Sequence, residues 1–135
     1  MSWDVLLIRT KTNRESMDEI KSENIIPFSQ AEIAHEIGKL AAELGAVCDC
    51  QDLSWQNLDS DVWSIEFNIG KNAETESVKL HIRGGEPKEV LALLPVDLNA
   101  RLIDCSTGEF IRPGEATSFE QWRAYRDQIL GRNEM

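Results

Sequence analysis

The order in which hydrophobic periodicity changes along the chain constrains the fold more than any other feature of the sequence. Strand-like and helical runs follow one another as a strand at 3–10, a helix at 29–44, strands at 62–69 and 77–83, a helix from 87 and a strand at 100–105. This βαββαβ order is the split-βαβ or ferredoxin-like pattern, and a third helical run follows at 118–130. We therefore expect an α+β fold with a four-stranded antiparallel sheet in the order 4-1-3-2 and helices on one face. The other face would be open to a partner or ligand.

The length and composition are those of a folded globule. With 135 residues, of which 41% are hydrophobic, the chain can bury a core, and we expect residues 1–135 to form a single domain. No apolar run approaches the roughly 18 residues of a membrane span, and the N-terminus MSWDVLLIRTK lacks the basic start of a secretory signal. Three cysteines do not make a disulfide framework, so we expect a cytosolic protein with reduced thiols.

The charge excludes one class of partner and favours another. Twenty-four acidic against fourteen basic residues leave a net charge of −10, so the chain lacks the basic footprint that nucleic-acid binding requires. Charge of this sign can steer a basic protein towards the surface, although it is also common in ordinary acidic cytosolic proteins.

Local signals define the first helix and the helix that begins near residue 87. Ser29 and Glu32 fit a capping box, an apolar stripe that includes Leu40 runs along the first helix, and Gly45 follows where a left-handed residue is wanted. In the second, Pro87 suits the first helical position, and Pro95 is expected to stop or kink the helix because proline lacks the amide hydrogen.

Two runs in the middle of the sequence alternate strictly between apolar and polar residues, which predicts a hairpin with one dry and one wet face. The polar side chains of the wet face are Glu66, Asn68, Lys79, His81 and Arg83. A His–Glu pair is the minimum for general acid–base chemistry, but opposite charges also stabilise an exposed sheet face. Catalysis, binding and simple solvated pairing are all open for this group.

A second candidate surface is acidic and contains a tryptophan. From Leu40 to Gly70 the chain has no lysine or arginine, and the residues that we expect to contact a basic partner are Asp49, Asp52, Trp55, Asp59 and Asp61. Charge accelerates the encounter of such partners, and a buried aromatic side chain supplies much of the affinity. The alternative is a solvated acidic loop whose tryptophans fill the core. Trp63 falls on the dry face of the hairpin, so Trp55 is the better contact residue.

Two further motifs are weak. Cys48 and Cys50, with His81 or Cys105 nearby, could hold zinc in principle, but paired zinc cysteines are usually two to four residues apart and four ligands are needed. We therefore expect no metal. The segment Gly84-Gly85-Glu86-Pro87 precedes a helix as phosphate loops do, but lacks their lysine and carries an acidic residue, so a strand-to-helix turn is expected.

The segments MSWDVLLIR, WSIEFNIG with SVKLHIRGG, and RLIDCSTGEFI together resemble a group of small acidic bacterial cytosolic proteins without an assigned function. The chain is also similar in size, charge and expected fold to immunity proteins that neutralise bacterial toxins. That resemblance implies a protein partner and no catalytic residues.

These observations favour a non-enzymatic cytosolic module, without a cofactor, that binds a basic protein. An immunity protein that covers the basic active site of a toxin domain is the leading interpretation. The alternative is a regulatory domain that binds a small molecule on the open sheet face or dimerises through it. An enzyme of the acylphosphatase type would need an arginine-bearing phosphate loop after the first strand, and residues 9–13 do not supply one.

Overall fold

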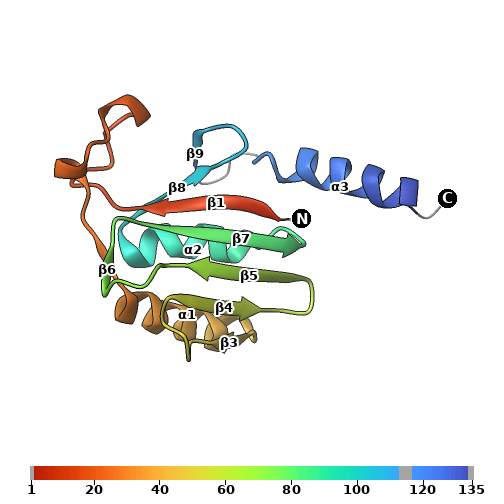
Figure 1. Ribbon diagram of the computed structural model, residues 1–135, viewed down its shortest axis with the longest axis horizontal. Coiled ribbons are helices and arrows are strands. Elements are labelled where there is room, and N and C mark those ends of the chain that lie inside the picture. Colours follow the sequence, from red (N-terminus) through yellow and green to blue (C-terminus); the bar gives the residue numbers. More distant parts are fainter. Residues whose placement is uncertain (1, 113–116, 134–135) are drawn as a thin grey trace.

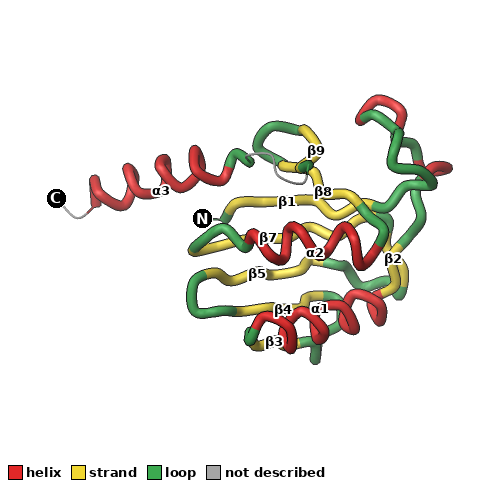
Figure 2. The backbone as a smooth tube through the Cα atoms, turned by 180° about the vertical axis from the view of Figure 1, so that it is seen from behind, coloured by secondary structure: helices red, strands yellow, loops and turns green. Residues whose placement is uncertain are grey.

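The computed structural model describes residues 2–112 and 117–133, and it has an α+β architecture with helices α1 and α2 packed on one face of an antiparallel sheet (Figures 1 and 2). The strand order of this sheet is β3-β4-β5-β7-β1-β8-β9. In that order the strands are Val47–Asp49, Trp55–Asp59, Trp63–Asn68, Ser77–Gly84, Trp3–Ile8, Arg101–Asp104 and Glu109–Ile111. A separate pair joins β2, Phe28–Ser29, to β6, Glu74–Thr75.

The prediction of a four-stranded ferredoxin-like sheet is wrong, because the described residues form a seven-stranded antiparallel sheet and a two-stranded one. The four predicted strands lie in the middle of the larger sheet as β5-β7-β1-β8, and β3, β4 and β9 extend it at both sides. Strands β3 and β4 lack the sequence pattern by which strands are recognised. Every residue of β3 is exposed, and Leu58 is the sole apolar residue that β4 buries. Apolar alternation is therefore almost absent from these two strands.

Helix α1, Gln30–Leu44, is the helix that the capping box and the apolar stripe predict, and the structure confirms it. The Ser29 hydroxyl accepts from the Glu32 amide, the Glu32 carboxylate accepts from the Ser29 amide, and Gly45 adopts a left-handed φ of 66°. The stripe including Ile33, Ile37 and Leu40 is buried against the sheet. None of the described helices has the length and apolar character that a membrane crossing requires.

Helix α2, Lys88–Leu98, differs from expectation at both prolines. Pro87 is the residue before the first helical one, and the helix continues through Pro95 instead of stopping there. Helical continuation is possible because the proline φ is itself helical, and burial of Leu91, Leu94 and Leu98 offsets the missing hydrogen bond. Left-handed Asn99 then ends the helix.

The hydrophobic core lies between these two helices and the sheet. Side chains from β1, β5 and β7 that point to the helix face are buried, and they include Trp3, Val5, Ile65, Phe67, Leu80 and Ile82. Helix α3, Phe119–Asn133, extends away from the sheet (Figures 1 and 2). Its first residue anchors it, because the buried Phe119 ring meets the Trp3 ring edge-on at 5.4 Å. The face of the sheet opposite α1 and α2 carries the polar half of the strand pattern.

Gly84, at the end of β7, is one position where glycine is required. Its φ is 87°, and a Cβ atom there would lie 2.8 Å from the backbone oxygen of Val62. We expect Gly84→Ala to lower the free energy of unfolding by about 2 kcal/mol, through backbone strain and steric overlap together. Gly108→Ala is the matched control, since Gly108 has a φ of 74° but no neighbouring atom within 4 Å of the methyl group that alanine would add. Equal losses for the two variants in chemical denaturation would contradict the steric argument.

Candidate functional site

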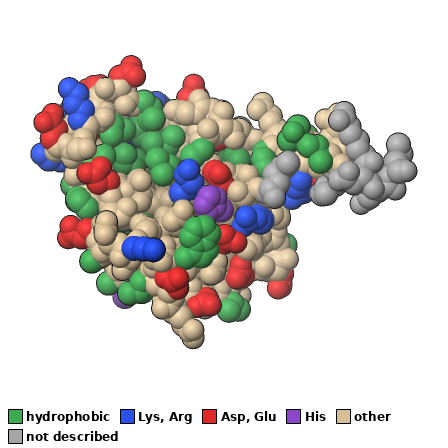
Figure 3. Space-filling model, in the orientation of Figure 1, with side chains coloured by type: hydrophobic (Ala, Val, Ile, Leu, Met, Phe, Trp, Pro, Cys, Tyr) green, Lys and Arg blue, Asp and Glu red, His purple; other side chains and the backbone are tan. Residues whose placement is uncertain are grey.

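The open face of the sheet carries a row of polar side chains that crosses four strands. In the antiparallel register Asp4 of β1 pairs with His81 of β7, His81 with Glu66 of β5, and Glu66 with Asn57 of β4. Residues paired in this way share a face of the sheet and lie about 5 Å from their neighbours. Acidic, basic and histidine side chains gather at the middle of this face (Figure 3). The register therefore builds a mixed-charge surface from residues far apart in the sequence.

A histidine held by an aspartate lies in this row. His81 Nδ1 is 2.9 Å from Asp4 Oδ1, and the Ser2 hydroxyl donates to the same oxygen at 2.6 Å. Because a carboxylate only accepts hydrogen bonds, Nδ1 carries the hydrogen in this contact. Asp4 therefore fixes the orientation of the imidazole ring.

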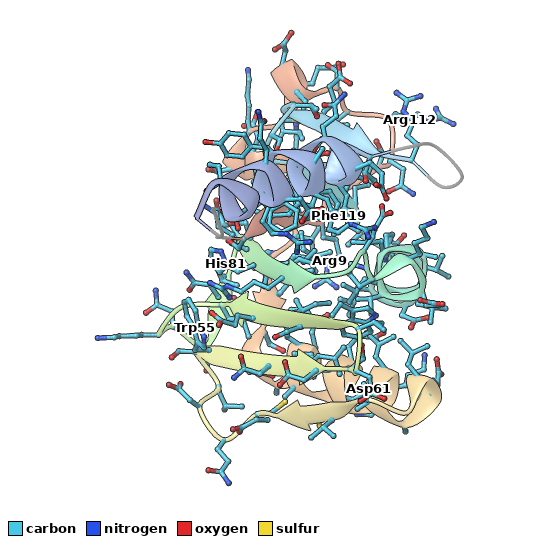
Figure 4. The ribbon with its side chains drawn as sticks, turned by 90° about the vertical axis from the view of Figure 1, so that its right-hand side faces the viewer. Arg9, Trp55, Asp61, His81, Arg112 and Phe119 are labelled. Carbon is cyan, nitrogen blue, oxygen red and sulfur yellow. The ribbon has the colours of Figure 1, made fainter. Side chains whose placement is uncertain are left out.

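The Trp55 side chain packs against the His81 ring from β4, which is separated from β7 by β5. Its ring is stacked on His81, with centroids 5.7 Å apart and planes inclined by 19°. Trp55 is the first residue of β4, and its amide donates to the Asp52 backbone oxygen across the preceding turn at 3.2 Å. Trp55 and His81 project from the side of the sheet away from α2 (Figure 4). With 38% of its surface exposed, Trp55 is held in place and still available for contact.

The open-face residues expected from the sequence meet in the structure. Glu66 and Arg83 form an ion pair with 2.9 Å between Oε1 and Nη1, and Lys79 is paired with Asn68 in the ladder. All these residues occupy β5 and β7, which adjoin each other in the sheet. The hairpin alternation placed them on one face correctly, and it placed Trp63 in the core, where the side chain is 6% exposed.

The acidic set around Trp55 is divided by the structure. Asp52 lies in the turn before Trp55, and hydrogen bonds from the Ser54 hydroxyl and amide lower the pKa of its carboxyl. Asp49 is paired with Asn57, on the same side as Trp55. Asp59 ends β4, about 13 Å along the strand from Trp55, and Asp61 lies in the loop that follows it. Asp59 accepts a hydrogen bond from Ser64 there, and Figure 4 shows Asp61 far from Trp55.

The residues considered as zinc ligands are not brought together. Cys48 is on β3 and His81 is on β7, three strand positions or about 14 Å away in the sheet order. Across residues 2–112 and 117–133, no three His, Cys, Asp or Glu side chains are grouped closely enough to hold a metal ion. The segment 84–87 links β7 to α2 as a turn, and the Glu86 carboxylate accepts from the Thr117 hydroxyl.

Two polar pairings were missed from the sequence. Asp4 was visible as the lone charge in an apolar run, but its pairing with His81 spans 77 residues of chain. The other pairing joins the buried Glu36 of α1 to the half-buried Asp97 of α2. Glu36 is 4% exposed, and burial, followed by the hydrogen bond and charge of Asp97, raises its pKa to about 7. Glu36 lies within the apolar stripe of α1, and that position was the available signal.

Comparison of the chain with protein-family models, with curated proteins and with solved structures finds no match. The assignment of a function therefore depends on the surface itself. A pocket of about 1140 Å³ lies between α2 and β9, and it does not include Trp55 or His81. The polar row lies instead on a broad sheet face, whose geometry suits contact with another macromolecule better than enclosure of a small substrate.

Proposed function

We propose that this protein is a non-enzymatic binding module that holds a basic protein on the open face of its sheet, with Trp55 as the anchor. The observation that carries the proposal is the exposed Trp55 ring stacked on a histidine that Asp4 holds in place. Tryptophan is enriched among the residues that dominate binding energy, and a side chain already fixed loses little entropy on binding. The orientation of the Trp55 ring is thus fixed before a partner binds.

Charge supplies the chemistry of the partner. The net charge of −10 attracts a basic protein over long range, and Asp49 and Asp52 lie on the Trp55 side of the sheet at short range. A cationic side chain of the partner can pair with these carboxylates while an apolar one packs on Trp55. Lys79 adds a positive charge to the same face, so the surface also favours one orientation of the partner over others.

Neutralisation of a toxin is the biological role that such a surface suits. An inhibitor of this kind works by covering a basic active-site cleft, so it needs a complementary acidic face and no catalytic group of its own. Action in the cytosol is part of the same proposal. The three free cysteines support it, because structural disulfides are rare in that compartment.

The decisive experiment starts with the protein as bait in cytosol from cells that express it. The captured basic protein is then purified, and its association and dissociation rates are measured against variants. Trp55→Ala is expected to accelerate dissociation by about 30-fold, or 2 kcal/mol, because the anchor is lost. Tyr125→Ala is the control, since Tyr125 is an exposed aromatic residue on α3, the helix that extends away from the sheet. Equal dissociation rates for the two variants would reject the proposed anchor.

Two matched charge reversals test the placement of the site. Asp52→Lys and Asp59→Lys change the net charge equally, but Asp52 adjoins Trp55 while Asp59 lies at the other end of β4. Association should slow as salt rises from about 0.05 to 0.5 M, and it should slow more for Asp52→Lys than for Asp59→Lys. The opposite order would move the interface towards the β4–β5 turn. The partner's own activity should fall on binding if occlusion is the mechanism.

A further inference from the structure

Cys48 and Cys50 lie on the same side of the free edge of the sheet. Cys48 is in β3, the outermost strand, where it is paired with the buried Leu58, and Cys50 follows two residues later and packs against the core. Side chains two residues apart in extended chain point the same way. The Cys48 side chain is exposed and that of Cys50 is half-buried, so the pair is reachable from solvent at one sulfur and sheltered at the other.

The thiol of Cys48 affects the titration of the Cys50 thiol. Burial raises the pKa of the Cys50 thiol, and the charge of Cys48 and a hydrogen bond with its thiol raise it further. Cα atoms two residues apart in a strand are separated by about 6.6 Å, and a disulfide requires less than about 6.8 Å. The pair is therefore just within the range in which a bridge can form.

The backbone around Cys48 and Cys50 can adjust to a disulfide. β3 ends at Asp49, and its outer edge pairs with no other strand of the described sheet. The chain turns immediately afterwards, where Asp49 Oδ1 accepts from the Gln51 amide at 3.1 Å. A small contraction between residues 48 and 50 thus disturbs one end of a short edge strand and leaves the core strands in place.

We propose that Cys48 and Cys50 form a redox-active dithiol, which a small disulfide of the oxidised-glutathione class converts into an intrachain disulfide. The exposed Cys48 thiolate attacks one sulfur of the small disulfide, whose S–S bond breaks, and the departing thiolate takes up a proton. The Cys50 thiolate then attacks the Cys48 sulfur and releases the second small thiol. The protein loses two hydrogens and is oxidised, while the small disulfide is reduced to two thiols.

Cys105 provides an internal control for this chemistry. It follows β8, five strand positions or about 24 Å from β3 in the sheet order, so it cannot bridge to either member of the pair within one chain. It is also exposed and can be alkylated. The reaction of Cys105 therefore distinguishes disulfide formation within the Cys48–Cys50 pair from the general reactivity of an exposed thiol.

The experiment uses the full chain, reduced and then freed of reductant. The protein is equilibrated in mixtures of oxidised and reduced glutathione, quenched with acid, alkylated, and measured by intact mass. Cys105→Ser should lose its two alkylatable thiols together, without a retained glutathione, and the wild type should lose the same two while glutathione is retained only on Cys105, which has no resolving partner. In the Cys105→Ser background, Cys48→Ser and Cys50→Ser should instead retain a glutathione adduct on the one remaining thiol, because it has no resolving partner. Disulfide formation should accelerate as the pH rises, since the thiolate is the nucleophile.

Three outcomes would overturn the proposal. In the first, all three cysteines of the wild type remain alkylatable in the oxidised mixture. In the second, Cys105→Ser retains glutathione as the single-cysteine variants do. In the third, non-reducing electrophoresis shows covalent dimers through Cys48, which would make the exposed thiol an intermolecular site. The readout is chemical and needs no partner, so it is independent of the proposed binding function.

Discussion

Leu40→Ala is expected to lower the free energy of unfolding by about 2–5 kcal/mol, because the substitution leaves a cavity between α1 and the sheet. Leu40 is completely buried in the cluster that joins α1 to the strands. The midpoint of chemical denaturation should fall while the slope of the transition stays constant.

Leu53→Ala is the control for this prediction, since it makes the same chemical change at a side chain that is 43% exposed. Its effect should be within about 0.5 kcal/mol. If the two variants were equally stable, the docking of α1 through this stripe would be refuted.

Glu36→Gln is expected to stabilise the protein at pH 8 and to flatten the dependence of its stability on pH. The Glu36 carboxyl is buried between α1 and α2, where Asp97 is its hydrogen-bonding partner. The same hydrogen bond lowers the pKa of Asp97, so Glu36 is the member that holds the proton. Lys39 Nζ lies 3.2 Å from Asp97 Oδ2 and compensates the Asp97 charge.

The direction of the pH dependence follows from the raised pKa of Glu36. The folded protein holds this proton up to about pH 7, whereas the unfolded chain releases it near the ordinary value of 4.5. Between these values the native state binds more protons than the unfolded state, so the stability falls as the pH rises through the window. The shift corresponds to a loss of about 3 kcal/mol, complete above pH 7.

A glutamine at this position keeps the shape and the hydrogen bond to Asp97 but has no proton to release. The gain at pH 8 should therefore approach that loss, while at pH 4 the variant and the wild type should be similar. Glu43→Gln is the matched control, because it removes the same charge from a more exposed position of α1. Denaturation curves between pH 4 and pH 8 provide the measurement. Parallel profiles for all three proteins would show that Glu36 does not hold a proton in the native state.

The redox pair lies next to the binding surface, at the β3 edge of the sheet. Asp49, between the two cysteines, is paired with Asn57 on the open face, one end of the polar row. Oxidation at β3 thus acts directly behind an acidic residue of the proposed interface. Measurement of the partner's dissociation rate from the oxidised and reduced forms would connect the two proposals once each has been tested separately.

Signals carried by a few adjacent residues were sufficient for several elements. The bounds of α1 follow from the reciprocal hydrogen bonds of Ser29 and Glu32 and from the left-handed Gly45. The inward positions of β5 and β7 follow from strict alternation, which residues such as Trp63 and Phe67 make unmistakable. These features could be predicted because the physical cause and its effect lie within one or two turns of chain.

The extent of the sheet was decided by tertiary contacts. In β4 the inward side chains are Gln56 and Leu58, and Gln56 is buried because its amide donates to the backbone oxygens of Gln30 and Leu53. An inward polar residue removes the alternation by which a strand is recognised. The membership of β4 therefore depends on acceptors that the fold brings to Gln56, one of them 26 residues earlier in the sequence.

The same distinction applies to the candidate site. The sequence alone determined that His81, Arg83 and Glu66 share the wet face of a hairpin, because alternation is a local property of extended chain. Only the tertiary structure decided that Asp4 orients His81, that Trp55 stacks on it, and that Asp97 faces Glu36. Each of these pairs joins separate elements, and the pairing is set by strand order and helix docking, which depend on the packing of the whole core.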